Sequence, residues 1–176
     1  MNPGIKKRFN KLQDQKKVLA DKVQNLNHEQ INSKVNSDGW TLGQVYYHLF
    51  LVEDGTFKYL ANKVKEIPAL ESRDIKSTYR FWLLKFFLAM PWKYKAPRTV
   101  SETIPDDIDI EEVLSNWTDI RDKFSLLLTA QEDRFLKKKV FKHPRIGYID
   151  FYQTIEFIEA HHQHHLRQIN NLLSKI

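Results

Sequence analysis

Four histidines lie within five consecutive residues, at positions 161, 162, 164 and 165. On a helix, the four-residue separation of His161 and His165 places them about 40° apart around the axis and one turn apart along it. Two imidazoles at this spacing can direct ring nitrogens at one first-row metal ion, as in the HExxH motif of zinc enzymes. The pair therefore predicts two ligands of a metal centre.

A third ligand has to come from another part of the chain, and His48 is the candidate. It lies at the edge of the apolar stripe of its own predicted helix, so two facing helices could bring His48, His161 and His165 to one point. The alternative is that each histidine makes an ordinary hydrogen bond at the margin of a core and binds nothing. Periodicity leaves both interpretations open.

Other polar residues near these positions are predicted to play smaller parts. Gln168 shares a helix face with His161 and His165, so it is either a hydrogen-bond partner of a ligand or a packing amide. His162 and His164 point away and are expected to pack in the bundle or lie on its surface. Four more residues are predicted to have no role: Glu53 and Asp54 as solvated carboxylates, His28 at a helix end and His143 in a loop.

The positioning elements are predicted to be helices, because five glycines and six prolines are too few for a protein built of tight turns. Thr41 with Gln44 predicts a capping box, with Trp40 as a hydrophobic staple, and Asp109 with Glu112 predicts a second box. The connector 93–109 has no helical period and is expected to cross the bundle as a loop. The expected helices cover residues 5–30, 41–66, 79–92, 110–131 and 149–174.

The composition excludes several kinds of chemistry. The chain has no cysteine, which excludes disulfides, thiolate metal sites and a cysteine nucleophile. The net charge of +6 comes from scattered basic runs that suit solvated helix faces, so no nucleic-acid partner is expected. The apolar segment 79–92 is too short to span a bilayer, and it is expected to be a buried or cleft-lining helix rather than an interfacial membrane helix. A cytoplasmic protein is expected.

Two stretches resemble a known family. "GWTLGQVYYHL", followed more than a hundred residues later by "HHQHHLRQI", is similar to the pattern of the DinB-like metal-dependent four-helix bundle family. The matching positions are Trp40, His48, His161, His165 and Gln168. The resemblance implies an all-α fold over residues 1–176 as one domain: a four-helix bundle with a long crossover connection and a short extra helix.

The resemblance also implies a function. His48, His161 and His165 would coordinate a divalent ion, most often zinc or nickel, and water would fill the remaining positions. Such an open site could lower the pKa of a bound water or hold a thiol as thiolate. The family includes transferases and isomerases that use bacillithiol, mycothiol or glutathione, so a thiol S-transferase or a hydrolase of a small-molecule substrate is expected, as a homodimer.

Two other functions stay open. The first is a non-catalytic bundle that binds a ligand or a partner protein through the aromatic residues Phe81, Trp82, Phe86 and Phe87. The second is a DNA-associated protein, suggested only by the basic charge balance.

Overall fold

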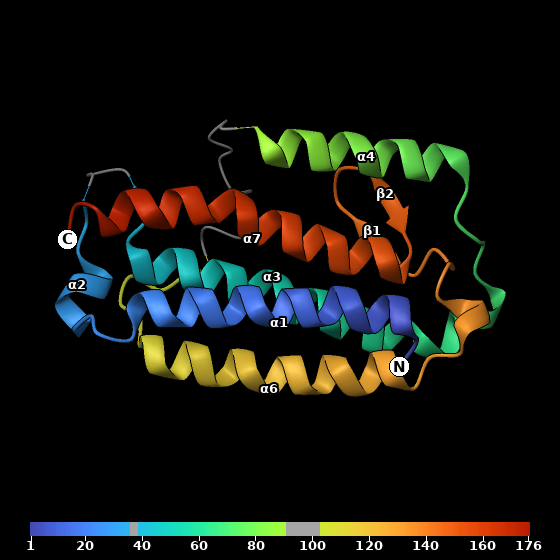
Figure 1. Cartoon of the computed structure of the whole chain (residues 1–176), viewed down its shortest axis with the longest axis horizontal. Coiled ribbons are helices and arrows are strands. Elements are labelled where there is room, and N and C mark those ends of the chain that lie inside the picture. The colour runs from blue at the N-terminus through green and yellow to red at the C-terminus, as the bar shows by residue number, and fades with distance from the viewer. Residues whose placement is uncertain (36–38, 91–102) are drawn as a thin grey trace.

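Four long helices form a bundle in the computed structural model, which describes residues 1–35, 39–90 and 103–176 (Figure 1). Two helices, α1 and α3, each contact both α6 and α7, so the four surround a common core. This confirms the predicted four-helix bundle. Their bounds are Pro3–Val23 for α1, Leu42–Lys63 for α3, Ile110–Thr129 for α6 and Phe151–Leu173 for α7.

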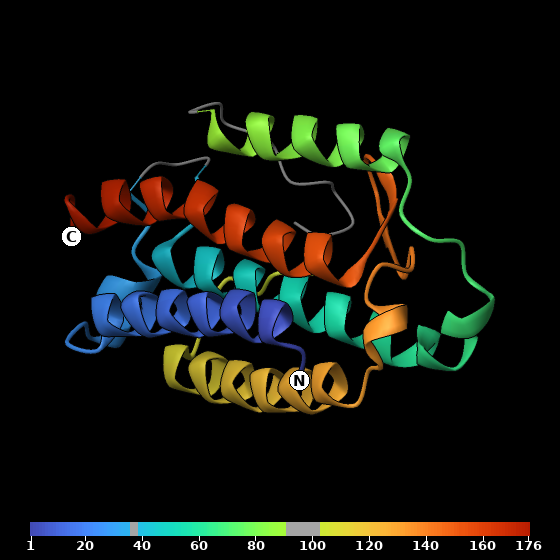
Figure 2. The same ribbon diagram turned by 45° about the vertical axis from the view of Figure 1, so that its right-hand side comes forward.

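Shorter elements lie around this bundle. The helix α4 is the predicted extra helix, and it packs on the outside against α7 and β2 (Figures 1 and 2). None of the described helices has the length and apolar character needed to cross a bilayer. The shorter elements are α2 (His28–Asn32), η1 (Val64–Ala69), α4 (Ile75–Ala89), η2 (Asp133–Phe135), β1 (Phe141–His143) and β2 (Gly147–Ile149).

Side-chain caps fix where the main helices begin. The Thr41 hydroxyl accepts from the Gln44 amide at 3.1 Å, and the Gln44 side chain accepts from the Thr41 amide, which confirms the predicted capping box. The Asp109 carboxylate accepts from the backbone of Glu111 and Glu112 and caps α6 at the predicted place, but the return bond from the Glu112 side chain that would complete the predicted box is not among the bonds of the described residues. Asp150 forms a further box at the start of α7. The two helices that carry the candidate ligands, α3 and α7, therefore have fixed starting points.

Several helix bounds and one hairpin differ from the prediction, and α4 begins at Ile75 instead of residue 79. The first helix ends at Val23 instead of residue 30, because Asn27 begins α2 with a capping box of its own. The second ends at Lys63, and the chain continues to Ala69 as a 3-10 helix that contains Pro68. An unpredicted antiparallel hairpin pairs β1 with β2 through a turn at Gly147, whose φ of 78° favours glycine. Residues 93–102 of the predicted crossing loop lie outside the described residues.

The core consists of two apolar clusters. On α1, for example, Leu12 belongs to one cluster and Leu19 to the other. Polar side chains from all four bundle helices occupy the level between the clusters. We call them the polar layer: Gln13 of α1, His48 and Glu53 of α3, Arg121 of α6, and His161, His162 and His165 of α7.

Candidate metal centre

Three imidazoles of the polar layer meet between α3 and α7. The ring centroid of His48 lies 5.1 Å from that of His161 and 5.0 Å from that of His165. The centroids of His161 and His165 are 4.7 Å apart. One possible ligand atom from each ring lies within 4.8 Å of the others. The structure thus brings together the three histidines that the sequence singled out, while their role as ligands stays a prediction.

Local structure explains why the rings converge. His161 and His165 are one turn apart on α7, so both face α3. His48 is buried, and its ring lies 5.0 Å from the indole of Trp40, just before the Thr41 cap. The tryptophan that carries part of the family resemblance therefore packs against the histidine contributed by α3.

Gln168 fixes the orientation of one imidazole. Its Oε1 lies 2.9 Å from Nδ1 of His165. An amide oxygen can only accept a hydrogen bond, so Nδ1 of His165 carries the proton and its Nε2 keeps the lone pair. A hydrogen bond of this kind is the usual support of a metal-ligating histidine. The structure thus favours the hydrogen-bonding interpretation of Gln168 over the packing one.

Burial keeps the three imidazoles neutral. Desolvation lowers the pKa of His48 to about 3 and that of His165 to about 4, and each has another histidine nearby that adds to the effect. Burial, followed by the proximity of His165 and His48, holds the pKa of His161 well below its usual value. The neutral form is the one that binds a metal.

The donor set fits a first-row ion. Nε2 of His48 and Nε2 of His161 are 3.3 Å apart. Two nitrogens bound to one ion at about 2.05 Å with a tetrahedral angle would be separated by about 3.3 Å. In addition, the Nδ1 atoms of His48 and His161 are buried without a hydrogen-bond partner among the described residues. The surrounding protein therefore leaves two ring nitrogens of the cluster without a hydrogen bond.

The predicted solvation of Glu53 and Asp54 is wrong. Glu53 is fully buried, where it accepts a hydrogen bond from Trp117 and pairs with Arg121. Asp54 is also buried and pairs with Lys58 at 2.6 Å. The sequence carries a signal for a buried Arg121, which follows Trp117 by four residues on the apolar side of its helix, but this signal does not identify Glu53 as the partner.

The remaining histidines are not among the three possible ligands. His162 is buried against Trp117, with ring centroids 5.3 Å apart. Nδ1 of His164 lies 3.0 Å from the carbonyl oxygen of Leu88 on α4. His28 pairs with Asp107 at the surface. The prediction of a loop position for His143 is wrong, because it is buried in β1.

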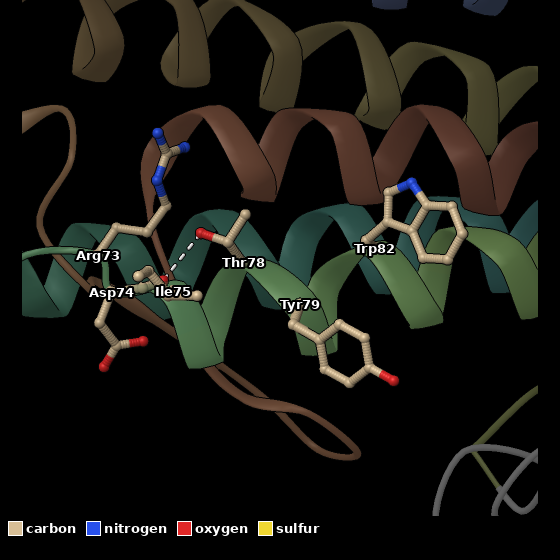
Figure 3. Close-up of a pocket in the computed structure, with 6 residues that line it drawn as sticks. All are labelled: Arg73, Asp74, Ile75, Thr78, Tyr79 and Trp82. Carbon is tan, nitrogen blue, oxygen red and sulfur yellow. Dashed lines mark hydrogen bonds between the residues drawn. The ribbon is translucent and has the colours of Figure 1, made fainter.

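The aromatic residues of α4 divide between two sides of the helix. Phe81 packs in the core, whereas Trp82, Phe86 and Phe87 are exposed. Figure 3 shows Trp82 at one end of a shallow surface groove of about 530 Å³ along the first half of α4. None of the residues lining it belongs to the histidine cluster. They are Arg73, Asp74, Ile75, Thr78, Tyr79 and Trp82.

Comparisons with known proteins agree with this architecture. A protein of Oceanobacillus iheyensis, named provisionally as the metal-dependent hydrolase OB0782, is 28% identical over 171 residues, covering 95% of this chain and 84% of its own length. The uncharacterized protein YuaE of Bacillus subtilis is 24% identical over 157 residues, covering 89% of this chain and 91% of its own.

A solved structure shares the fold. YfiT of Bacillus subtilis, described provisionally as a metal-dependent hydrolase with an unusual four-helix bundle topology, superposes with a TM-score of 0.61 at 17% identity. The match covers 98% of this chain and 87% of YfiT. Residues 11–169 also match the family pattern of the DinB superfamily. With its bundle, its three-histidine cluster and this match over most of its length, the chain belongs to the DinB superfamily.

Proposed function

We propose that the protein is a divalent-metal-dependent enzyme whose ion is held by His48, His161 and His165. The observation that carries this proposal is the convergence of three neutral imidazoles from two helices, with one possible ligand atom of each within 4.8 Å of the others. The Nε2 atoms of His48 and His161 are separated by 3.3 Å, about the spacing of two ligands on one ion, so a bound ion explains the close approach of the imidazoles.

The residues of the chain would hold and orient the ion. The hydrogen bond from His165 to Gln168 directs Nε2 of His165 inward, and burial keeps protons from competing for the ring nitrogens. Three protein ligands leave coordination positions open, which is typical of catalytic rather than structural zinc sites. An ion bound there supplies Lewis-acid activation of water, or of a thiol, near neutral pH.

The reaction is proposed to be hydrolysis of a small substrate or transfer of a low-molecular-weight thiol. The provisional name of the OB0782 protein supports hydrolysis. The transferase alternative rests on the family resemblance, and the absence of cysteine is compatible with it because the thiol would be a cosubstrate. Zinc and nickel are the proposed ions.

Metal analysis tests the proposal. Protein purified without an affinity tag should contain or take up about one equivalent of zinc or nickel, and His165→Ala should lose this binding. His164→Ala is the matched control, since it removes a neighbouring imidazole that contacts the Leu88 carbonyl of α4 and packs edge-on against His165, but is not one of the three possible ligands. Less than about 0.2 equivalents bound by the wild type after titration would rule out the metal centre.

A second candidate function is non-catalytic binding through α4. The exposed aromatic side chains of Trp82, Phe86 and Phe87 favour it, because such residues are common in contact surfaces. Ligand or partner binding that persists after chelation and is lost in Trp82→Ala would support this function over the enzymatic one.

A further inference from the structure

One carboxylate at the centre of the polar layer connects all four bundle helices. Glu53 of α3 is fully buried and accepts hydrogen bonds from the Trp117 indole and from Nη2 of Arg121, the latter at 3.0 Å, both from α6. Nε of Arg121 also contacts Oε1 of Glu53, so the pair is held in two places. Nη1 of Arg121 donates to Oε1 of Gln13 on α1 at 3.0 Å.

The fourth helix reaches the same carboxylate through His162. Its Nε2 lies 3.6 Å from Oε2 of Glu53, and its ring packs edge-on against Trp117. Neither ring nitrogen of His162 has a hydrogen-bond partner among the described residues. His162 is the next residue after His161, so whatever sets the position of His162 also sets that of the candidate ligand.

Glu53 therefore lies next to candidate ligands on both helices, although its 3.6 Å contact with His162 of α7 is too long for a hydrogen bond. On α3 it follows His48 by five residues, and on α7 its neighbour His162 adjoins His161. A slip of one residue would move a helix by about 1.5 Å and turn its side chains by about 100°. Metal sites tolerate deviations of only about 0.2 Å in ligand distance. Apolar contacts alone, which re-form after small slips, would not hold the three imidazoles to that tolerance.

Stability is a poor explanation for this ion pair. Burying two charges costs desolvation, and apolar side chains of similar size often replace such pairs without loss of stability. Apolar contacts depend little on orientation. The planar guanidinium of Arg121, in contrast, pairs with the carboxylate of Glu53 in only a few orientations. The charged pair thus fixes a register between α3 and α6.

We propose that Glu53, together with Arg121, is a positioning residue that holds His48 in register with His161 and His165. This proposal rests on the proposed function, because its expected consequence is a change in metal affinity. Neither residue is one of the three that could hold the ion.

The test replaces the charged pair by a neutral one. In Glu53→Gln/Arg121→Met, no unpaired charge is buried, and glutamine can still accept from the Trp117 indole. Thermal unfolding of the metal-free variant should stay near that of the wild type, whereas the Kd for zinc or nickel should rise by at least about 10-fold, as for lost supporting groups at metal sites. The d–d spectrum of bound cobalt should change as well, because the ligand geometry is altered.

A matched control separates register from stability. Leu128→Ala removes a buried side chain on the same helix as Arg121, about two turns further along it. It should lower the Tm and leave metal affinity and the cobalt spectrum unchanged. Arg121→Lys is the second variant. It keeps the positive charge but loses the planar set of guanidinium donors, so a folded protein with weakened metal binding is expected. Wild-type metal affinity in a folded Glu53→Gln/Arg121→Met or Arg121→Lys variant would overturn the proposal.

A distance measurement distinguishes this proposal from the metal centre itself. Because the chain has no native cysteine, Gly55→Cys on α3 and Gln163→Cys on α7, both exposed, allow nitroxide labelling at only two sites. The electron-spin distance distribution should shift or broaden in the neutral-pair variant but not in Leu128→Ala. If the wild type binds no metal, the proposed function fails while this measurement still tests the register. Identical distributions would refute the positioning role.

Discussion

Acidification should destabilise the metal-free protein strongly between pH 6.5 and pH 4. His48 and His143 are both buried, and burial lowers their pKa values from 6.5 to about 3 and about 4. Within this window the unfolded chain binds a proton at each of these positions and the folded chain does not, so the free energy of unfolding falls as the pH falls.

The size of the effect follows from the same pKa values. Each such histidine lowers the free energy of unfolding by about 1.4 kcal/mol per pH unit below 6.5. At pH 5 this is about 2 kcal/mol for each, or about 4 kcal/mol for His48 and His143 together, a large part of the 5 to 15 kcal/mol typical of a domain. Burial lowers the pKa of His161 and His162 too, so both act in the same direction.

Urea denaturation followed by tryptophan fluorescence measures this loss. Unfolding curves are recorded in a chelator at pH 7, 6 and 5, and the free energies are compared at constant m. His143→Leu serves as an internal control, because removing one titrating imidazole should reduce the slope by about 1.4 kcal/mol per pH unit. A free energy of unfolding that changes by less than about 1 kcal/mol between pH 7 and 5 would show that these imidazoles are not kept neutral by the fold.

Two further predictions concern single side chains. Gln168→Leu should weaken metal binding about 10-fold by freeing the ring of His165, as isothermal titration would measure, and unchanged affinity would contradict this role. Gly43→Ala should destabilise the protein by about 1 to 3 kcal/mol, since its Cβ would lie 2.8 Å from Cβ of Ile108. Gly55→Ala in the same helix has open space and should stabilise by about 0.5 to 1 kcal/mol, so equal melting temperatures for the two variants would refute this packing argument.

The sequence was informative where chemistry and periodicity coincide. The four-residue spacing of His161 and His165 and the edge position of His48 make these three imidazoles candidates, the resemblance to the DinB-like pattern favours them as ligands, and the structure brings them together. The Thr41 capping box was equally readable, because both partners lie within four residues of each other.

The sequence does not predict features that depend on contacts with several other elements of the fold. The angle of Glu53 from His48 around the helix axis predicts a solvated carboxylate. However, α3 packs against α6 as well as α7, so the buried surface of α3 is wider than one stripe. The partner Arg121 lies 68 residues away, and no local pattern joins the two. The hairpin was missed because strands of three residues are too short to show alternation.

The candidate ligands are far apart along the chain. His48 precedes His161 by 113 residues, so a chain emerging from the ribosome presents the first imidazole long before the other two. An ion that requires all three can be captured only after α7 has been synthesised and has docked against α3. Once bound, it would close a loop of this length and penalise the unfolded chain much as a long-range cross-link does. Metal binding would therefore occur only in chains whose bundle has been assembled correctly.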